Sequence, residues 1–596
     1  MTVDREIIYT KDDDDVNMKE SPAAVSDMAV DKPWLGFYGE IPTTIEYPNQ
    51  SMVSLIIEKA TKNPELIATD FFGCTFSYGV LAEQVQLCAR GLADIGIMAG
   101  QRVTICLPNT PQAVVMFYAI NLIGAVANMV HPLSPEEELA RILIESESVA
   151  VLTLDQFADK LLGVLSQTPA NTLFLSGIDD GLTGLKSKLY GLTKGRKIKR
   201  LKSAGNVLRY KDLLNRGRRY EAEYKHEGKG SDIAVIIYSG GTSGTSKGVL
   251  LTNMNVNALA MQAGVLADCL TQGNKMLAIL PVFHGFGLGV CIHTSLLYGL
   301  SVILMPQFSM EAYLKVLRKQ KPNYIAGVPT MFEALLRMEN TDNLDLSQLQ
   351  GIFCGGDSLS IELKNKVDKF LKERGCKEQV REGYGLTESV TVNCLTPRRN
   401  YKEGSIGIPL PDMLIKIVKP GTTEKLPLGI EGEIVVSGPT VMLGYNNNEE
   451  ETAQTLKQHY DGRTWLHTGD IGLMDEDGFV YFKQRMKRMI ITAGFNVYPS
   501  ALENIIESHE SVLISCVIGV PDELKVQCPK AFIILKDGIE PTEEIKNSII
   551  KHCEKKIVKY AMPKEFEYRK ELPRTMIGKV AYLELEKEEE AKRAKP

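Results

Sequence analysis

The 596-residue sequence lacks several features that identify common classes of protein. Its eleven cysteines form no Cys-X-X-Cys pair and no tight cluster, which argues against a disulfide scaffold or a zinc ribbon and fits a reducing cytosol. We find no internal repeat, and 44% hydrophobic with 24% charged residues excludes a largely disordered chain, a collagen and a coiled-coil rod. The length exceeds what one hydrophobic core normally organises, so several domains are expected.

The sequence also lacks a strong excess of one charge and a clear membrane span. Its net charge of −6 provides no general surface for nucleic acid. The first residues are acidic, whereas secretory and mitochondrial signals need a basic start, so we expect a cytoplasmic protein. The apolar stretches 113–130 and 279–305 contain polar residues that are costly in hydrocarbon, and we interpret both as buried core.

The pattern along the chain predicts three regions. Residues 1–32, which include a run of aspartates, are expected to form a flexible leader. Residues 33–486 alternate apolar strands with helices and predict a large α/β body with several subdomains and buried parallel strands. Residues 487–596 predict a small α+β domain, in which Pro499 and Thr542 begin helices.

The strongest chemical signal is the glycine-rich loop YSGGTSGTSKG at 238–248, which follows an apolar run at 235–238. Glycines let backbone N–H groups turn inward, and hydroxyls and Lys247 add donors that suit a polyphosphate. The loop is not a Walker loop, because Ser246 precedes the lysine and Gly248 follows it. A flexible surface loop is the alternative, and the preceding strand favours phosphate binding.

Three further motifs are weak signals individually. GYGLTES at 383–389 contains a tyrosine that can stack on a purine and a glutamate that can hold Mg²⁺. Its Thr-Glu pair, however, is also a common start of a helix. LHTGD at 466–470 suits a ribose diol or an ordinary turn, and PRTMIGK at 573–579 ends in a lysine on a glycine turn. GFGLG at 285–289 and GGDSL at 355–359 look like a dinucleotide loop and a carrier-protein attachment site, but both lack the required context.

In this order the motifs resemble those of the adenylate-forming superfamily, which includes acyl-CoA synthetases, firefly luciferases and non-ribosomal adenylation domains. The resemblance extends over about residues 33–585 and includes LPVFH (280–284) as the gate motif. QRMK (484–487) and ITAGFNVYPSALE (491–503) resemble the hinge and the block that follows it. Four positions depart from the pattern and leave the stiffness of the phosphate loop and the resting position of the hinge in doubt: Gly240, Ser246, Gln484 and Arg488.

The resemblance implies a role for individual residues. The implied substrate-binding residues are Thr242, Ser243 and Lys247 for pyrophosphate, Gly356 and Tyr384 for adenine, Asp470 and Arg485 for ribose, and Lys487 and Gly494 for the CoA step. The implied catalytic residues are Lys579, Thr387, Glu388 and His284, with Glu388 as the Mg²⁺ ligand and Thr387 at the α-phosphate. The small C-terminal domain would be mobile and pivot at Lys487, which would retract Lys579 and bring Gly494 over the pantetheine tunnel.

The activity implied by the resemblance is the ATP-dependent conversion of a carboxylic acid to acyl-AMP and then, with CoA, to acyl-CoA. The segment after His284 and the segment 327–332 would line the acyl pocket, and neither offers a spare cation for a second charge on the substrate. This favours a medium- or long-chain fatty acid, with an aromatic acid still open. A ligase of the same fold that loads a carrier protein and a catalytically weak acyl or nucleotide binder remain as alternatives, and the oligomeric state stays open.

One segment departs from the acidic average. Residues 186–219 contain thirteen Lys and Arg residues against one acid, Asp212, which gives a local net charge of +12. Such a segment can rest on anionic lipid at the inner face of a membrane. A solvent-exposed segment that projects from the body explains this concentration of charge at least as well.

Overall fold

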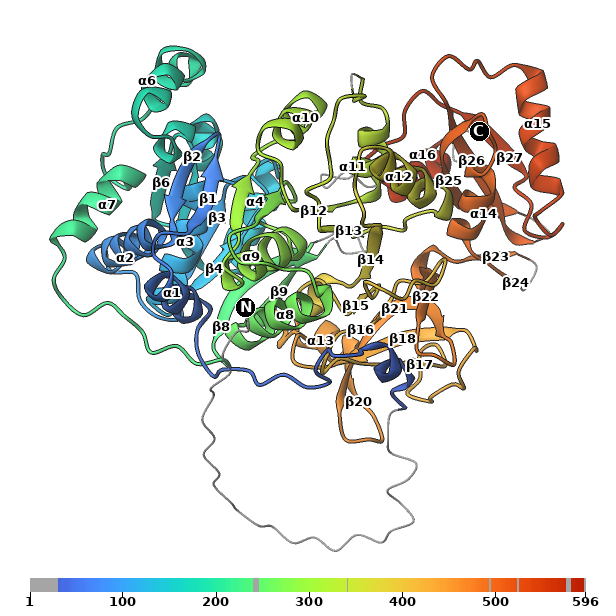
Figure 1. Ribbon diagram of the computed structural model, residues 1–596, viewed down its shortest axis with the longest axis horizontal. Coiled ribbons are helices and arrows are strands. Elements are labelled where there is room, and N and C mark those ends of the chain that lie inside the picture. The colour runs from blue at the N-terminus through green and yellow to red at the C-terminus, as the bar shows by residue number, and fades with distance from the viewer. Residues whose placement is uncertain are drawn as a thin grey trace, which may run out of the picture.

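The computed structural model describes residues 31–239, 246–339, 341–492, 495–522, 525–574 and 580–593. These residues form a large α/β body and a smaller unit built from the C-terminal part of the chain, which lies beside the body (Figure 1). The predicted fold class, an α/β body with several sheets followed by a small α+β unit, is confirmed. Except for Asp31 and Lys32, the expected leader lies outside the described residues.

The first sheet of the body has the strand order β19-β9-β8-β4-β3-β5-β6-β7. Its strands are β3 (Arg102–Cys106), β4 (Val126–Met129), β5 (Ser148–Leu154), β6 (Thr172–Ser176), β7 (Val207–Arg209), β8 (Ile233–Ser239), β9 (Lys247–Thr252) and β19 (Gly444–Tyr445). The strands from β8 through β7 in this order are parallel to their neighbours, and helix α3 (Pro111–Leu122), which connects β3 to β4, is buried along its whole length.

The expectation of parallel strands is wrong for the pair that flanks the glycine-rich loop. β8 is parallel to β4, but β9 returns antiparallel to β8, with Ser239 opposite Lys247. The connection is too short for the crossover of a dozen or more residues that parallel strands need, so the chain forms a hairpin. Lys247 therefore begins the return strand.

The second sheet has the order β16-β15-β14-β13-β12-β10-β11-β1-β2, and its central strands are parallel. Its strands are β1 (Ile67–Phe71), β2 (Cys74–Ser77), β10 (Lys275–Ala278), β11 (Ser301–Leu304), β12 (Tyr324–Gly327), β13 (Gly351–Gly355), β14 (Val380–Tyr384), β15 (Cys394–Leu395) and β16 (Ile408–Pro409). Because carboxyl ends of parallel strands share one edge, Gly356 after β13 and the last residue of β14 come close together.

An antiparallel sheet and a mixed sheet, in which β27 runs parallel to β26, complete the fold. The third sheet contains β17 (Leu414–Val418), β18 (Gly432–Ser437), β20 (Leu456–Gln458), β21 (Thr464–Met474) and β22 (Val480–Arg485). The C-terminal sheet contains β23 (Ile490–Thr492), β24 (Phe495–Val497), β25 (Val512–Asp522), β26 (Val526–Leu535) and β27 (Glu565–Tyr568). Helices α14 (Pro499–Glu507) and α15 (Glu543–Glu554) begin as the sequence predicts, and the Thr542 side chain accepts a hydrogen bond from the Ile545 N–H at the start of α15.

The other helices cover the sheets. They are α1 (Met52–Lys62), α2 (Tyr78–Asp94), α4 (Glu136–Glu145), α5 (Ala158–Leu165), α6 (Gly184–Leu192), α7 (Tyr210–Arg219), α8 (Asn253–Ala267), α9 (Ser295–Leu297), α10 (Met310–Lys319), α11 (Pro329–Leu336), α12 (Ile361–Glu373), α13 (Glu449–Thr455) and α16 (Tyr582–Arg593).

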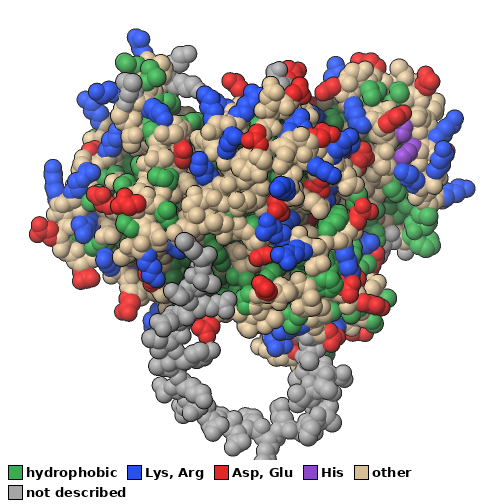
Figure 2. Space-filling model, in the orientation of Figure 1, with side chains coloured by type: hydrophobic (Ala, Val, Ile, Leu, Met, Phe, Trp, Pro, Cys, Tyr) green, Lys and Arg blue, Asp and Glu red, His purple; other side chains and the backbone are tan. Residues whose placement is uncertain are grey.

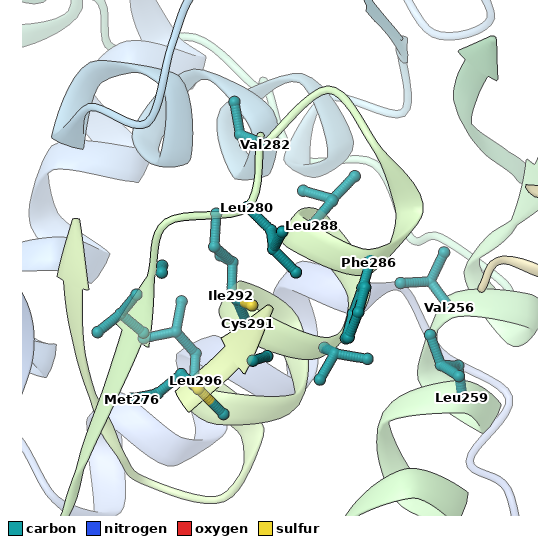
Figure 3. Packing of buried hydrophobic residues seen from close by; sticks show 14 of the residues in the cluster. Val256, Leu259, Met276, Leu280, Val282, Phe286, Leu288, Cys291, Ile292 and Leu296 are labelled. Atoms are coloured by element: carbon teal, nitrogen blue, oxygen red, sulfur yellow. The ribbon is translucent and has the colours of Figure 1, made fainter. Parts of the chain in front are cut away.

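Both apolar stretches of the sequence lie in the core, as predicted. The first forms α3 and β4, and the second forms the π-helical segment η5 (Phe286–Thr294), α9 and β11. Figure 3 shows the buried side chains of η5 packed beside Val256 and Leu259 of α8. Within the described ranges, no helix combines the length and the apolar character needed to cross a bilayer.

A buried histidine inside this core predicts sensitivity to acid. His293 in η5 lies between the Tyr118 hydroxyl, 3.0 Å from its Nδ1, and the Asn257 carbonyl oxygen, 2.9 Å from its Nε2. Burial lowers the pKa of His293 to about 3. Between the unfolded pKa of about 6.5 and the folded value, only the unfolded chain takes up this proton, so the free energy of unfolding falls by about 1.4 kcal/mol per pH unit as pH decreases.

We predict that His293→Gln makes the unfolding free energy depend less steeply on pH between pH 6 and pH 4. The slope should fall by the amount that one proton contributes. Denaturant titrations at a series of pH values measure this slope. His226→Gln, at a partly exposed histidine, is the matched control and should leave the slope unchanged. An equal slope in His293→Gln and the parent protein would contradict the assignment.

Candidate active site

Two motifs that are far apart in sequence meet through a buried hydrogen bond. The hydroxyl of Tyr384, at the end of β14, donates to Asp470 Oδ2 at 2.8 Å across 86 residues. Burial, followed by the nearby Asp470 charge, raises the pKa of Tyr384 well above its usual range, so the hydroxyl stays protonated and remains a donor. Arg485 lies opposite Asp470 in the β21–β22 register, with its Nε 3.4 Å from Asp470 Oδ1. Three of the four predicted adenine and ribose residues therefore form one cluster, and the fourth is Gly356.

A second cluster contains the predicted lysine and glutamate. Lys247 forms an ion pair with Glu451, and its Nζ lies 5.3 Å from the centre of the Tyr445 ring. The Tyr445 hydroxyl donates to Glu388 Oε1 at 2.9 Å. Thr387 precedes Glu388 in the short helix η6 (Thr387–Ser389). One tyrosine thus connects the end of the glycine-rich loop with the predicted metal ligand.

The predicted gate residue lies beside the segment that follows Glu388. His284 Nδ1 accepts a hydrogen bond from the Phe286 N–H at 3.2 Å. A Cβ placed on Gly285 would approach the Val390 carbonyl oxygen to 1.8 Å, so only glycine permits this contact. Val390 itself has φ of +65°, a conformation that is costly for a β-branched residue. Such strain is typical of functional segments.

An apolar cavity opens at the same edge of the second sheet. Its open space is about 50 Å³. Its lining residues come from α8, β10, η5, β13, β14 and β15 and the segments that flank them: Ala263, Ala267, Leu270, Met276, Phe286, Val290, Thr294, Phe353, Cys354, Gly355, Gly356, Gly383, Thr391, Val392 and Leu395. Among these described residues none is charged. The predicted segment after His284 thus contributes to the lining, whereas residues 327–332 do not, although Val328 packs beside Gly356.

Arg381 lies beside Phe353 of the cavity lining, and each of its three nitrogens already donates a hydrogen bond. It is buried, with its guanidinium 5.5 Å from the centre of the Phe353 ring. Its three nitrogens donate to the carbonyl oxygens of Thr396, Ala267 and Leu266 at 2.8, 2.5 and 2.9 Å. Arg381 is therefore a structural cation rather than a partner for a charged substrate group.

The hinge residues lie between the third sheet and the C-terminal sheet. Lys487 is exposed in the short helix η7 (Met486–Arg488), whereas Arg488 is largely buried and forms an ion pair with Glu503 of α14. Arg488 stands where the related motif has an acid, and its partner belongs to the C-terminal unit. This pairing fixes Arg488 to that unit and leaves Lys487 as the exposed residue before it.

Four predicted site residues lie outside the described part of the chain: Thr242, Ser243, Gly494 and Lys579. The departure at Ser246 does have a structural counterpart. Its hydroxyl donates to Glu138 at 2.9 Å and accepts from Arg141 Nη2 at 2.8 Å, which fastens the end of the glycine-rich loop to α4. These contacts supply restraint where the related motif has a proline.

Sequence reasoning missed Tyr445, Glu451 and Arg381. Each becomes significant only through a partner that is distant in sequence, since Tyr445 lies 57 residues from Glu388 and Lys247 lies 204 residues from Glu451. A tyrosine after a glycine and a glutamate within an acidic helix are common surface patterns. No local signal in the sequence distinguishes them.

The chain is similar to known proteins over most of its length. Residues 56–446 match the family model described as AMP-binding enzyme, and residues 501–579 match the model of the AMP-binding enzyme C-terminal domain. The long-chain-fatty-acid–CoA ligase of Bacillus subtilis is 34% identical over 94% of this chain and 99% of that protein, and the one of Salmonella typhimurium is 32% identical over the same shares. A solved structure, the ATP-bound RpMatB-BxBclM chimera B1, has a TM-score of 0.79 and 25% identity, and covers 91% of this chain and 99% of its own.

The buried Tyr384–Asp470 contact predicts an effect on nucleotide affinity. Tyr384→Phe keeps the ring but removes a hydrogen bond to a buried carboxylate, which is worth about 1.5–3 kcal/mol. We expect part of this loss to appear as a roughly tenfold weaker affinity for ATP, because the carboxylate is no longer oriented. Isothermal titration calorimetry measures the affinity.

Tyr481→Phe is the matched control, since the Tyr481 hydroxyl donates to Asp475 at 3.3 Å elsewhere on the β21–β22 hairpin. Its affinity for ATP should stay within twofold of the parent value. Equal affinities in Tyr384→Phe and the parent protein would show that Asp470 does not depend on this hydrogen bond.

Proposed function

The chain belongs to the AMP-binding enzyme family, and from this premise we propose that it is an AMP-forming acyl-CoA synthetase that activates long-chain fatty acids. The observation that carries the proposal is the contact between Tyr384 and Asp470, because it joins two separate nucleotide motifs at one edge of the second sheet. The apolar cavity opens at the same edge, beside Gly356. Nucleotide and acyl group would thus meet where the two motifs converge.

The reaction proceeds in two steps. First, a carboxylate oxygen of the acid attacks the α-phosphorus of ATP, an O–P bond forms, and pyrophosphate leaves with the electrons of the broken bond. Second, the sulfur of CoA attacks the acyl carbon, a C–S bond forms, AMP leaves, and the thiol proton passes to solvent. Both partners in the first step are anions, so the protein contributes mainly alignment and charge neutralisation.

The site residues keep the roles that the sequence predicts for them. Lys247, with Thr242 and Ser243, holds the departing pyrophosphate, and Thr387 contacts the α-phosphate. Lys579 stabilises the charge that develops during the first step. The ion pair of Lys247 with Glu451 supports this role, because it orients the ammonium beside the glycine-rich loop.

Glu388 suits a Mg²⁺ ion that arrives with ATP. Its Oε1 is held by Tyr445, and among the described residues no donor binds its other oxygen. Within the same ranges there is no group of three or more acidic, histidine or cysteine side chains that could hold a metal. One carboxylate plus substrate phosphates is a common Mg²⁺ arrangement, and the ion supplies neutralisation of phosphate charge.

The C-terminal unit, residues 487–596, pivots on the body at Lys487 between the two steps, and residues 33–486 form the adenylating body. Two observations support this division. Arg488 pairs with Glu503 inside the C-terminal unit, whereas Arg485 lies beside Asp470 in the body. The residues between them therefore connect two separately anchored groups, as a hinge requires.

Three observations support a long-chain monocarboxylate as the substrate. The described cavity lining has no charged side chain, and Arg381 spends its donors on backbone carbonyls. Two relatives that match nearly the full length of this chain are long-chain-fatty-acid–CoA ligases. The open space of about 50 Å³ must widen to take such a chain, and the flexible side chain of Met276 at its wall can adapt.

A panel of carboxylic acids, scored separately for pyrophosphate release and for acyl-CoA, tests the function. We expect long-chain acids to give both products, and aromatic acids and diacids to give neither. Pyrophosphate release without acyl-CoA would favour transfer to a carrier protein. The absence of both products with every acid would contradict the proposal.

Lys579→Ala tests the proposed mechanism. Loss of one charge contact in the transition state costs about 3–5 kcal/mol, so adenylation should fall by two to four orders of magnitude. Formation of acyl-CoA from pre-made acyl-AMP should remain near the parent rate. Lys570→Ala, at an exposed lysine nearby, is the control and should leave both steps intact. An equal loss in both steps would exclude this role for Lys579.

We further propose that helix α6, within the basic segment 186–219, contacts an anionic membrane surface. Much of the segment's charge is already paired, because Lys199, Arg200, Arg209, Lys211 and Arg216 form ion pairs with acids outside it. Figure 2 shows Lys and Arg side chains gathered in the region where Figure 1 places α6.

Exposed leucines on α6 supply the apolar part of such a surface. The exposed fractions of Leu189 and Leu192 are 58% and 74%. Lys188, which directly precedes Leu189, is exposed and has no acidic partner among the described residues. Exposed apolar side chains flanked by lysines suit the interface of an anionic membrane.

Replacing both leucines by serine should weaken binding to vesicles of anionic lipid about tenfold or more, since each leucine contributes up to about 1.5 kcal/mol on insertion. Ile430→Ser, at another aliphatic side chain that is 50% exposed, is the matched control. Vesicle flotation measures binding, and turnover of a soluble short-chain acid should stay constant in every variant. If vesicle binding is absent, or if the leucine substitutions do not change it, α6 is a solvent-exposed part of the body that does not contact the membrane.

A further inference from the structure

The ribose residue Asp470 lies in a bulge of strand β21. Between two pairs of opposite residues, β21 contains more residues than its neighbour β18, and the additional length falls at residues 468–470. A bulge of this kind re-aims a side chain and is common beside active sites. The geometry of the bulge therefore decides where the Asp470 carboxylate points. The pairs that flank it are Val435 with His467 and Glu433 with Ile471.

Glu433 of β18 contacts this bulge with both oxygens of its side chain. Its Oε1 accepts a hydrogen bond from the Gly469 N–H at 3.2 Å, and its Oε2 accepts one from His467 Nδ1 at 3.0 Å. Gly469 has φ of +68°, in the left-handed region that favours glycine, and it directly precedes Asp470. Because Glu433 is only 4% exposed, solvent cannot readily replace either bond.

The surroundings keep the Glu433 side chain charged and oriented. Although burial acts to raise it, the hydrogen bonds from His467 and from the Gly469 N–H leave the pKa of Glu433 below its usual value. The other ring nitrogen of His467, Nε2, lies 3.0 Å from Nε2 of His459, which is also buried. Burial lowers the pKa of His459 to about 4, so this second ring is neutral near pH 7. The His467 ring is thus held on both sides.

The bulge and the Asp470 side chain are fixed by different partners. Thr468 Oγ1 donates to the Ile434 carbonyl oxygen at 2.6 Å and accepts from the Asp470 N–H at 3.1 Å. Thr468 and Glu433 thus restrain the backbone of the bulge, whereas Tyr384 contacts the Asp470 carboxylate itself. Of the two restraints on the backbone, only the one from Glu433 carries a charge and reaches both Gly469 and His467.

We propose that Glu433 is a positioning residue for nucleotide binding: through Gly469 and His467 it holds the bulge that directs the Asp470 carboxylate to the two hydroxyl groups of the ribose. The inference rests on the proposed function, in which Asp470 contacts the ribose of ATP. Two adjacent hydroxyls can donate to one carboxylate only within a narrow geometry. Loss of the restraint therefore weakens the contact with the ribose hydroxyls more than the contacts with the phosphates.

Glu433→Gln tests the proposal, with ATP and 2′,3′-dideoxy-ATP as probes in calorimetric titrations of the full chain. The substituted amide has one acceptor oxygen where the carboxylate has two, so it loses one of the two hydrogen bonds. The parent protein should bind ATP about tenfold or more tightly than the dideoxy analogue, because only ATP donates to Asp470. In Glu433→Gln the affinity for ATP should fall about tenfold and that for the analogue less than about threefold.

Asp461→Asn is the matched control, because Asp461 is another buried carboxylate of the same sheet. It accepts a hydrogen bond from Trp465 Nε1 at 3.1 Å at the start of β21 and lies 3.4 Å from Lys416 Nζ. This variant should lower the melting temperature, as Glu433→Gln should, but the ratio of the two nucleotide affinities should stay within about twofold of the parent ratio.

A pair of substitutions at His467 decides the question if Glu433→Gln does not fold. His467→Leu removes the side-chain donor to Glu433 and should lower the preference for ATP over the dideoxy analogue several-fold. His467→Asn keeps an N–H donor near the place of Nδ1 and should retain most of that preference. Equal preferences in these two variants would contradict the role of the His467–Glu433 contact.

Three results would overturn the proposal. An unchanged ratio of the two affinities in Glu433→Gln, with both affinities falling together or neither changing, would reduce Glu433 to a purely structural role. Equal affinities of the parent protein for the two nucleotides would show that Asp470 does not bind the ribose hydroxyls, while the proposed function would stand. The absence of ATP binding by the parent protein would overturn the proposed function and this inference together.

Discussion

The active-site geometry depends on one buried contact, the hydrogen bond from Tyr384 to Asp470. Tyr384 ends a parallel strand of the second sheet, and Asp470 lies in the third sheet, so the bond fixes the position of one sheet against the other. Burial keeps the tyrosine protonated, and the low local polarity strengthens its bond to the carboxylate. Arg485 extends the contact to the last residue of β22, two residues before the proposed pivot Lys487.

A tyrosine also organises the phosphate side of the site. Tyr445 donates to Glu388, and its ring lies beside Lys247. Lys247 also forms an ion pair with Glu451. In the proposed reaction the phosphates of ATP would compete with Glu451 for this lysine.

Charge compensation also changes the interpretation of the basic segment. As a sequence, residues 186–219 have a net charge of +12, but five of their cations contact acids from other parts of the body. The cations that remain without an acidic partner among the described residues include Lys188, beside the exposed leucines of α6, and Arg218 of α7. Both features are products of folding, because composition cannot indicate which charges are paired.

The sequence by itself determined the α/β class and, through its resemblance to the adenylate-forming superfamily, the family and the reaction. It also predicted the candidate site residues, because the motifs that carry the resemblance are local features. It also indicated that residues 113–130 are core, since polar residues in hydrocarbon are costly. Only the tertiary structure decided that Tyr445 donates a hydrogen bond to Glu388 and that the three nitrogens of Arg381 already donate to backbone carbonyls. The reason is physical: these depend on contacts between residues tens to hundreds of positions apart, which leave no periodic trace in one sequence.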